Sequence, residues 1–152
     1  MKLRSSSAEY EVGLQVAETA AYRIYLCEEV ASGRQCLLQI ATSVEHSGGL
    51  DKAAYVLRKL RATAEEFETI HAERGGKRLL SYERLFPELV DSFVPEEQGR
   101  RRVNILAFSE VSDIRLMVPL SNLTSKDRLR LDLRSSAWVL GRLLKLLWFT
   151  HG

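Results

Sequence analysis

Between residues 53 and 71, apolar side chains recur at every third or fourth position. Because an α-helix turns once in about 3.6 residues, this spacing brings them onto one face and predicts an amphipathic helix of about five or six turns. Gly75 and Gly76 follow the stripe and predict the end of the helix. Such a helix needs an apolar surface to pack on, which the rest of the chain has to supply. The stripe consists of Ala53, Leu57, Leu60, Ala64, Phe67 and His71, and we expect His71 to lie at the edge of the core.

Three segments with the character of β-strands precede this helix. Apolar residues alternate from Tyr10 to Val16, which is the period of a half-exposed strand. The segment 22–30 (YRIYLCEEV) is rich in aromatic and β-branched residues, and the turn-forming ASG at 31–33 leads back into RQCLLQIAT at 34–42. Together they predict an antiparallel meander.

Two further strands are predicted after the helix, at 87–97 (PELVDSFVPEE) and 101–111 (RRVNILAFSEV). The arginines 100–102 follow a string of turn formers and charges, so we expect them at a solvated hairpin tip. The predicted fold class is therefore α+β, with a five-stranded antiparallel sheet and one long helix packed on it.

The segment 112–131 contains scattered polar residues and little periodicity, and it predicts a hinge or linker. From 132 to 152 the chain is helical by pattern, and Asp132 or one of the serines can cap it. This helix is apolar around more than half of its circumference, so we expect a cover from another protein, from a missing part of the polypeptide or from a second copy of the chain. Its apolar residues are Ala137, Leu140, Leu143, Leu144, Leu146, Leu147 and Trp148.

Composition narrows the class of protein. The 152 residues are 45% hydrophobic and 28% charged, which suits one domain with a real core. The net charge of +2 gives no overall attraction to nucleic acid or an acidic membrane, so neither is an expected partner. Cys27 and Cys36 lack the spacing of a zinc site, and we expect them reduced and buried. Residues 1–9 lack the pattern of a secretory signal and are expected to be disordered, and a cytoplasmic location follows as the default.

The order of these elements resembles the N-terminal lobe of a protein kinase running into the first large helix of its C-terminal lobe. The resemblance covers residues 10–152, with a lobe-like domain at 10–111, a hinge or linker at 112–131 and the truncated start of a C-lobe-like helical region at 132–152. The catalytic loop and the metal-binding motif of the family would follow Gly152. The resemblance rests on the pattern of elements more than on motifs.

The motifs that hold ATP in this family are degenerate here. The segment 17–24 (AETAAYRI) occupies the place of the glycine-rich loop, with Ala17, Thr19 and Tyr22 where its three glycines would stand. Gln39 takes the place of the lysine that pairs with the nucleotide phosphates and with a helix glutamate. The resemblance implies further nucleotide-pocket positions at Ile24, Leu37, Phe108 (the gatekeeper position), Glu110 and Val111.

Gln39 lies in a run of apolar residues, where an amide without partners costs about 1–3 kcal/mol. By the resemblance, it would hydrogen-bond the helix glutamate, for which Glu66 is the first candidate and Glu65 the second. A neutral amide attracts phosphate much less than a lysine does, because charge-assisted hydrogen bonds are about twice as strong. The resemblance thus implies a pseudokinase-type interaction or regulatory module with no catalytic residues, cofactor or metal.

Three alternatives stay open. Gln39 is also compatible with an ordinary strand residue that hydrogen-bonds a neighbour. The complete polypeptide could be an atypical ATP- and magnesium-dependent phosphotransferase whose catalytic residues follow Gly152, with Lys52 or Lys59 replacing the strand lysine. A small α+β adaptor without kinase kinship would also give this order of elements, since a fold alone does not define a function.

Overall fold

The computed structural model describes residues 1–73, 86–109, 111, 113–117, 128, 130 and 132–151. The chain divides into two units, Met1–Met117 and Val118–Gly152, which are described separately. The first unit contains β1 (Lys2–Arg4), β2 (Glu9–Glu18), β3 (Tyr22–Glu29), β4 (Gln35–Ala41), α1 (Ser47–Glu73), β5 (Glu88–Phe93), the 3-10 turn η2 (Glu96–Gln98), β6 (Val103–Ala107) and the 3-10 turn η3 (Ile114–Leu116). The second contains α3 (Leu133–His151).

The fold is α+β, with an antiparallel sheet of six strands in the order β1-β2-β3-β4-β6-β5. Five of them are the predicted strands. The sixth, β1, lies in the segment expected to be disordered, so the predicted strand count is wrong. Leu3 packs into the core at 1% exposure, and Lys2 and Arg4 form ion pairs with Glu9 on β2 at 3.1 and 2.9 Å.

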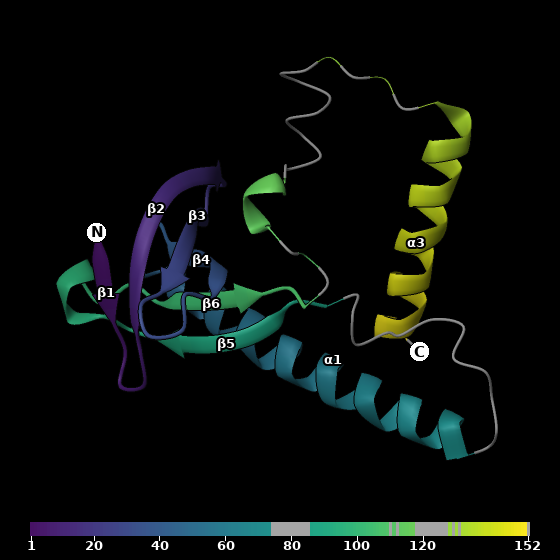
Figure 1. The fold of residues 1–152 in the computed structure, drawn as a ribbon, viewed down its shortest axis with the longest axis horizontal. Helices are drawn as coiled ribbons and strands as arrows, with labels where there is room; N and C mark the ends of the chain where they lie inside the picture. The colour runs from purple at the N-terminus through teal and green to yellow at the C-terminus, as the bar shows by residue number, and fades with distance from the viewer. Residues whose placement is uncertain are drawn as a thin grey trace. The chain divides into compact units, whose positions relative to one another are not determined.

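Figure 1 shows that the sheet is curled. The main core consists of residues that lie on one face of this sheet. Side chains alternate between the two faces of a strand, so every second residue of β4 and of β6 enters this core. Cys27 and Cys36 stand opposite each other on β3 and β4, and both are buried free thiols, as predicted. The core consists of Leu3, Tyr10, Val12, Cys27, Cys36, Leu38, Ile40, Val103, Ile105 and Ala107.

The curl brings the β1–β2 end of the sheet against β5, its opposite edge. The Ser7 hydroxyl and the Tyr10 hydroxyl both donate to Oδ2 of Asp91 on β5, at 3.0 and 3.3 Å. The ring of Tyr10 stacks on that of Phe93, with centroids 6.1 Å apart. These contacts span more than 80 residues of sequence and fasten the two edges together.

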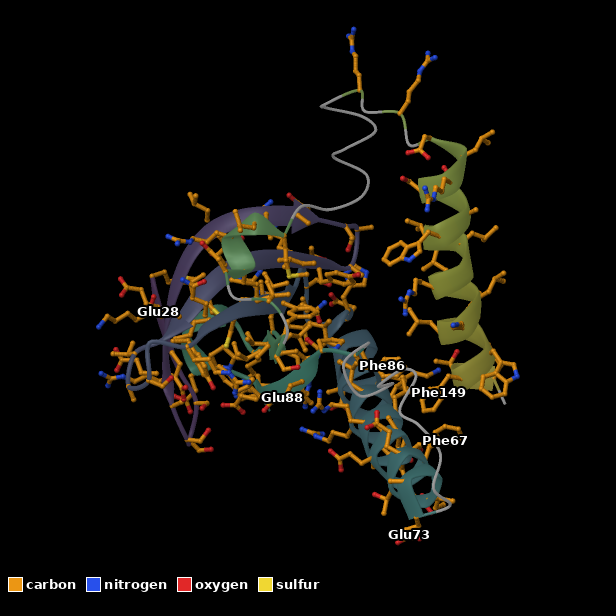
Figure 2. The ribbon with its side chains drawn as sticks, turned by 45° about the vertical axis from the view of Figure 1, so that its right-hand side comes forward. Glu28, Phe67, Glu73, Phe86, Glu88 and Phe149 are labelled. Carbon is orange, nitrogen blue, oxygen red and sulfur yellow. The ribbon has the colours of Figure 1, made fainter. Side chains whose placement is uncertain are left out.

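Helix α1 confirms the predicted amphipathic helix, but its buried face is rotated slightly from the predicted one. Leu50, Ala54, Ala64 and Glu68 are buried, whereas Phe67 is 41% exposed. The predicted stripe residues Ala53, Leu57 and Leu60 are half-buried beside this line. The side chain of His71 and both Gly75 and Gly76 lie outside the described residues. Figure 2 shows Glu73 at the end of α1 that is remote from the sheet.

The second hairpin is present, but its tip differs from the prediction. Gly99 adopts φ 61° and Arg100 φ 60°, which turns the chain between β5 and β6. Arg100 is exposed, whereas Arg101 and Arg102 are half-buried. Arg101 donates to the backbone carbonyls of Gln98 and Ala41, at 3.0 and 3.4 Å. The expectation of a solvated arginine tip is therefore wrong, because the guanidinium of Arg101 reaches backbone carbonyls of η2 and β4.

In the second unit, Asp132 caps α3, as one of the two predicted options. Its carboxylate accepts from the backbone N–H of Ser135 at 3.0 Å and from the Ser135 hydroxyl at 2.7 Å. No residue of α3 is buried. Among the described residues, no helix combines the length and the apolar character that crossing a bilayer would require. Apart from η3 and its neighbours, most of the predicted linker lies outside the described residues.

Candidate functional site

The sheet gathers several of the predicted nucleotide-pocket positions into one row. The register pairs Ala17 with Ile24, Ile24 with Gln39 and Gln39 with Asn104, across β2, β3, β4 and β6. Leu37, two residues before Gln39, belongs to the next row on the same face. These residues face away from the main core, since alternate residues of β4 point into it.

Asn104 identifies this face as the one that carries α1. Its Nδ2 donates to the backbone carbonyl of Leu50, in the first turns of α1, at 2.9 Å. Its Oδ1 accepts from the hydroxyl of Ser92 on β5 at 2.8 Å. Asn104 is fully buried, so it is the amide that the fold encloses and satisfies. It lies within an apolar run, VNILA, as Gln39 does, and that shared pattern is the signal by which it could have been found.

A guanidinium extends the network that Asn104 starts. Arg102 donates through Nη1 to the Ser92 hydroxyl at 2.9 Å, and its Nη2 lies 3.2 Å from the Asp51 carboxylate on α1. The backbone N–H of Arg102 donates to the Ser47 hydroxyl at 3.1 Å. The beginning of α1 is thus fixed to β5 and β6 by polar contacts, which set the position of the helix on this face.

Gln39 itself is half-buried, and its side chain makes no hydrogen bond within the described residues. The predicted partners Glu65 and Glu66 are both exposed on α1. The carboxylate of this helix that is buried belongs to Glu68, at 7% exposure. The structure therefore places Gln39 on the helix-bearing face without joining it to either predicted glutamate.

The turn between β2 and β3, where the resemblance places the phosphate-binding loop, is closed by Thr19. Its hydroxyl accepts from the backbone N–H groups of Ala21 and Tyr22, at 3.3 and 3.0 Å. The same hydroxyl and the Thr19 N–H both donate to the Tyr22 carbonyl, at 3.0 and 2.9 Å. Three backbone N–H groups of the turn are therefore already used inside it.

The chain that follows β4 holds this turn in place. The Thr42 hydroxyl donates to the Ala20 carbonyl at 2.8 Å, and the Thr42 N–H donates to the Ala21 carbonyl at 2.9 Å. At the mouth of the turn, Glu18 pairs with Arg23 at 2.8 Å, and that hydrogen bond keeps the pKa of Glu18 below its usual value. The turn carries side chains and an ion pair where a phosphate cradle needs open backbone N–H groups.

Two surface depressions lie on the first unit, and one of them includes two of the predicted positions. One, of about 490 Å³, is lined by Phe108 and Val111 together with residues of the β3–β4 turn. The second, of about 390 Å³, lies between β2, β3 and η3, and Gln35 lines both. The Gln35 Oε1 is buried and has no hydrogen-bond donor among the described residues. Neither depression includes Gln39, so these two cavities do not unite the predicted pocket residues, and Glu110 lies outside the described part.

The lysines considered as replacements for the missing strand lysine are exposed on α1. Lys59 lies over the ring of Tyr55, 5.9 Å from its centroid. Within the described residues, no three histidine, cysteine, aspartate or glutamate side chains lie close enough together to hold a metal ion.

No protein-family model, curated protein or solved structure matches this chain.

Proposed function

We propose that the first unit is a degenerate, protein kinase-like N-terminal lobe that does not bind nucleotide and acts as a protein-interaction or regulatory module. The order of its elements supports this proposal: after β1 come three antiparallel strands, a long helix and two more strands. The row formed by Ala17, Ile24 and Gln39 also supports it, because it brings loop and strand positions of the resemblance together.

The observation that carries the loss of nucleotide binding is the closed β2–β3 turn. A phosphate bound there would have to compete with the Thr19 hydroxyl for the N–H groups of Ala21 and Tyr22. Gln39, two strands away from Ala17 in the same row, brings no positive charge to compensate. Since a charged donor binds an anion about twice as strongly as a neutral one, both sources of phosphate affinity are weak here.

Thermal unfolding with ATP and magnesium tests this proposal. A ligand at 100 times its dissociation constant stabilises a protein by about 2.7 kcal/mol, which is roughly 10 °C for a unit of this size. We expect no shift for the wild-type chain. The double variant Thr19→Gly, Gln39→Lys, which opens the turn and restores the cation, should gain a shift if these two positions are what the site lacks.

The control for this experiment is Arg58→Gln, which alters an exposed cation on α1 without touching the row. A clear wild-type shift that Gln39→Ala removes would contradict the proposal and favour a nucleotide-dependent phosphotransferase instead. For the interaction role, affinity capture with and without ATP and magnesium should recover the same partners. Partners that change with nucleotide would argue for an active pocket.

A further inference from the structure

Helix α3 carries a wide apolar side that the described residues leave open. Four leucines and one tryptophan of residues 140–148 are exposed to water, and such a contiguous apolar patch marks a contact with a protein or a membrane. At about 100° per residue, they cover an arc of roughly 140° over residues 140–148. They are Leu140, Leu143, Leu144, Leu147 and Trp148, with exposed fractions between 48% and 63%.

The opposite side of α3 is basic. Arg134, Arg142 and Lys145 fall within an arc of roughly 80°, and the segment 133–151 contains no acidic residue. The guanidinium of Arg142 lies over the ring of Trp138, 5.1 Å from its centroid. Arg128 and Arg130, both exposed, add positive charge shortly before the helix. The chain's net charge of +2 therefore conceals a local excess of cations on and beside this helix.

We propose that α3 lies along the surface of an anionic lipid bilayer, with its leucine side in the acyl boundary and its cations among the headgroups. Amphipathic helices of this kind combine a Trp- and Leu-rich face with Lys and Arg on the polar face. The pattern fits a helix that lies in the interface rather than one that crosses the bilayer, since α3 does not meet the requirements of a span. The expectation of no membrane partner rested on the overall net charge and on the lack of an apolar run long enough to cross a bilayer, and neither criterion detects a basic amphipathic helix.

The charge of α3 distinguishes a lipid surface from a second copy of the chain. Two α3 helices packed through their leucine sides would leave the three cations of each helix on the outer side, with no carboxylate on either helix to pair with them. An anionic leaflet, by contrast, attracts every Lys and Arg near its surface. Tryptophan also favours the headgroup region, where its ring is apolar and its N–H finds acceptors.

Intrinsic fluorescence of the full chain tests the proposal directly, because its only two tryptophans, Trp138 and Trp148, both lie on α3. Vesicles of phosphatidylcholine with phosphatidylserine should shift the emission to the blue, and vesicles of phosphatidylcholine alone should shift it far less. Added salt should reverse the binding. The variant Trp138→Phe keeps only Trp148, on the leucine side, and Trp148→Phe keeps only Trp138, beside Arg142. The blue shift of the emission should be larger for Trp138→Phe than for Trp148→Phe.

Substitutions separate the two contributions. Lys145→Gln should lower the vesicle partition coefficient about five-fold, the effect of one cation near an anionic surface, and Leu144→Glu should abolish binding. The matched control Lys59→Gln removes the same charge from α1 and should leave binding unchanged. Circular dichroism confirms that each variant keeps its fold.

Three results would overturn the proposal. The first is the absence of a blue shift with anionic vesicles, which would mean that a second copy, an acidic protein groove or another lobe covers α3 instead. Sedimentation velocity of the wild type and of Leu144→Glu shows whether that cover is a second copy of the chain. The second is equal binding to neutral and anionic vesicles. The third is a loss of binding in Lys59→Gln as large as that in Lys145→Gln.

Discussion

Replacing the buried amide of Asn104 should destabilise the first unit and loosen the beginning of α1. The variant Asn104→Ala removes the donor to the Leu50 carbonyl and the acceptor of the Ser92 hydroxyl, at 2.9 and 2.8 Å in the wild type. It also leaves a small void at a fully buried position. The residue connects α1, β5 and β6, so the change weakens the joint between three elements.

The expected loss follows from these contacts. Each hydrogen bond contributes about 1 kcal/mol net, and a buried partner left unpaired raises the loss to about 1–3 kcal/mol. Ser92 keeps its contact with Arg102, so its hydroxyl is not left alone. Including the void, we expect the free energy of unfolding to fall by about 3 kcal/mol. At a urea m-value of roughly 2 kcal/mol per molar, the midpoint should fall by roughly 1.5 M.

Urea unfolding followed by far-ultraviolet circular dichroism measures this loss, since both tryptophans lie on α3, in the second unit. Ser92→Ala is the matched control, because it removes one hydroxyl and keeps the bond from Asn104 to Leu50. It leaves the buried Oδ1 of Asn104 without its donor, so it should lose about 1–2 kcal/mol, less than Asn104→Ala because the bond to Leu50 remains and no void forms at position 104. Hydrogen exchange should show faster exchange at the start of α1 in Asn104→Ala than in Ser92→Ala.

A loss below about 1 kcal/mol for Asn104→Ala would refute this reasoning, because it would mean that the amide does not fasten α1 to the sheet. The same conclusion would follow if Ser92→Ala destabilised the unit as much as Asn104→Ala. Equal exchange rates at the start of α1 in the wild type and both variants would also contradict it.

Two further predictions concern a tyrosine and two glycines. Burial, together with the neighbouring Asp91 carboxylate, raises the pKa of Tyr10 above its usual value, so the unfolded chain ionises first, near pH 10. The stabilisation is complete below that pH and is lost as pH rises above it, and urea unfolding at alkaline pH should show a shallower decline for Tyr10→Phe than for the wild type. Gly33 adopts φ +68°, and a Cβ added there would meet no atom within 4 Å, so Gly33→Ala should lower the free energy of unfolding by about 1 kcal/mol through backbone strain alone. Gly48→Ala, in the first turn of α1, should raise it by up to about 1 kcal/mol in the same assay. Equal effects of the two substitutions would contradict the reasoning.

Much of the first unit follows from hydrophobic periodicity. The alternation from Tyr10 to Val16 and the runs at 22–30 and 34–42 predict three strands, because one face of each has to be buried. The strand β1 has only three residues, too few for a period to show. It forms because Leu3 is buried in the core and because Lys2 and Arg4 pair with Glu9 on β2. Both interactions depend on the folded sheet, so a local sequence pattern does not predict them.

The rotation of the α1 face has a similar cause. A stripe of residues spaced by three or four positions marks a broad sector, not the single line that meets the sheet. Phe67 was expected in that line, but Glu68 is the buried residue, and a buried carboxylate runs against composition rules. A small rotation of the helix about its axis decides which of the two is buried, and the spacing of the apolar residues does not fix that rotation.

The candidate site was only partly accessible from sequence. The row formed by Ala17, Ile24 and Gln39 follows once the strands pair in the expected register. The use of the Thr19 hydroxyl to close the turn could not be deduced, because serine and threonine reach several backbone groups at similar energies. Gln39 attracted attention as a polar residue in an apolar run, whereas Asn104, in the same situation on β6, proved to be the amide that the fold encloses.

The contacts that join Ser7 and Tyr10 to Asp91 have a consequence for how other chains can approach. A sheet invites extra strands where a border of unpaired amides and carbonyls is straight and open. In this protein the β1–β2 end of the sheet contacts β5, the strand at the opposite edge. The part of β2 after Val12 is irregular in its pairing with β3. These features disfavour the addition of a strand from another chain, and therefore also the polymerisation that strand addition can cause. We expect partner proteins to be recognised through side-chain contacts rather than through backbone hydrogen bonds.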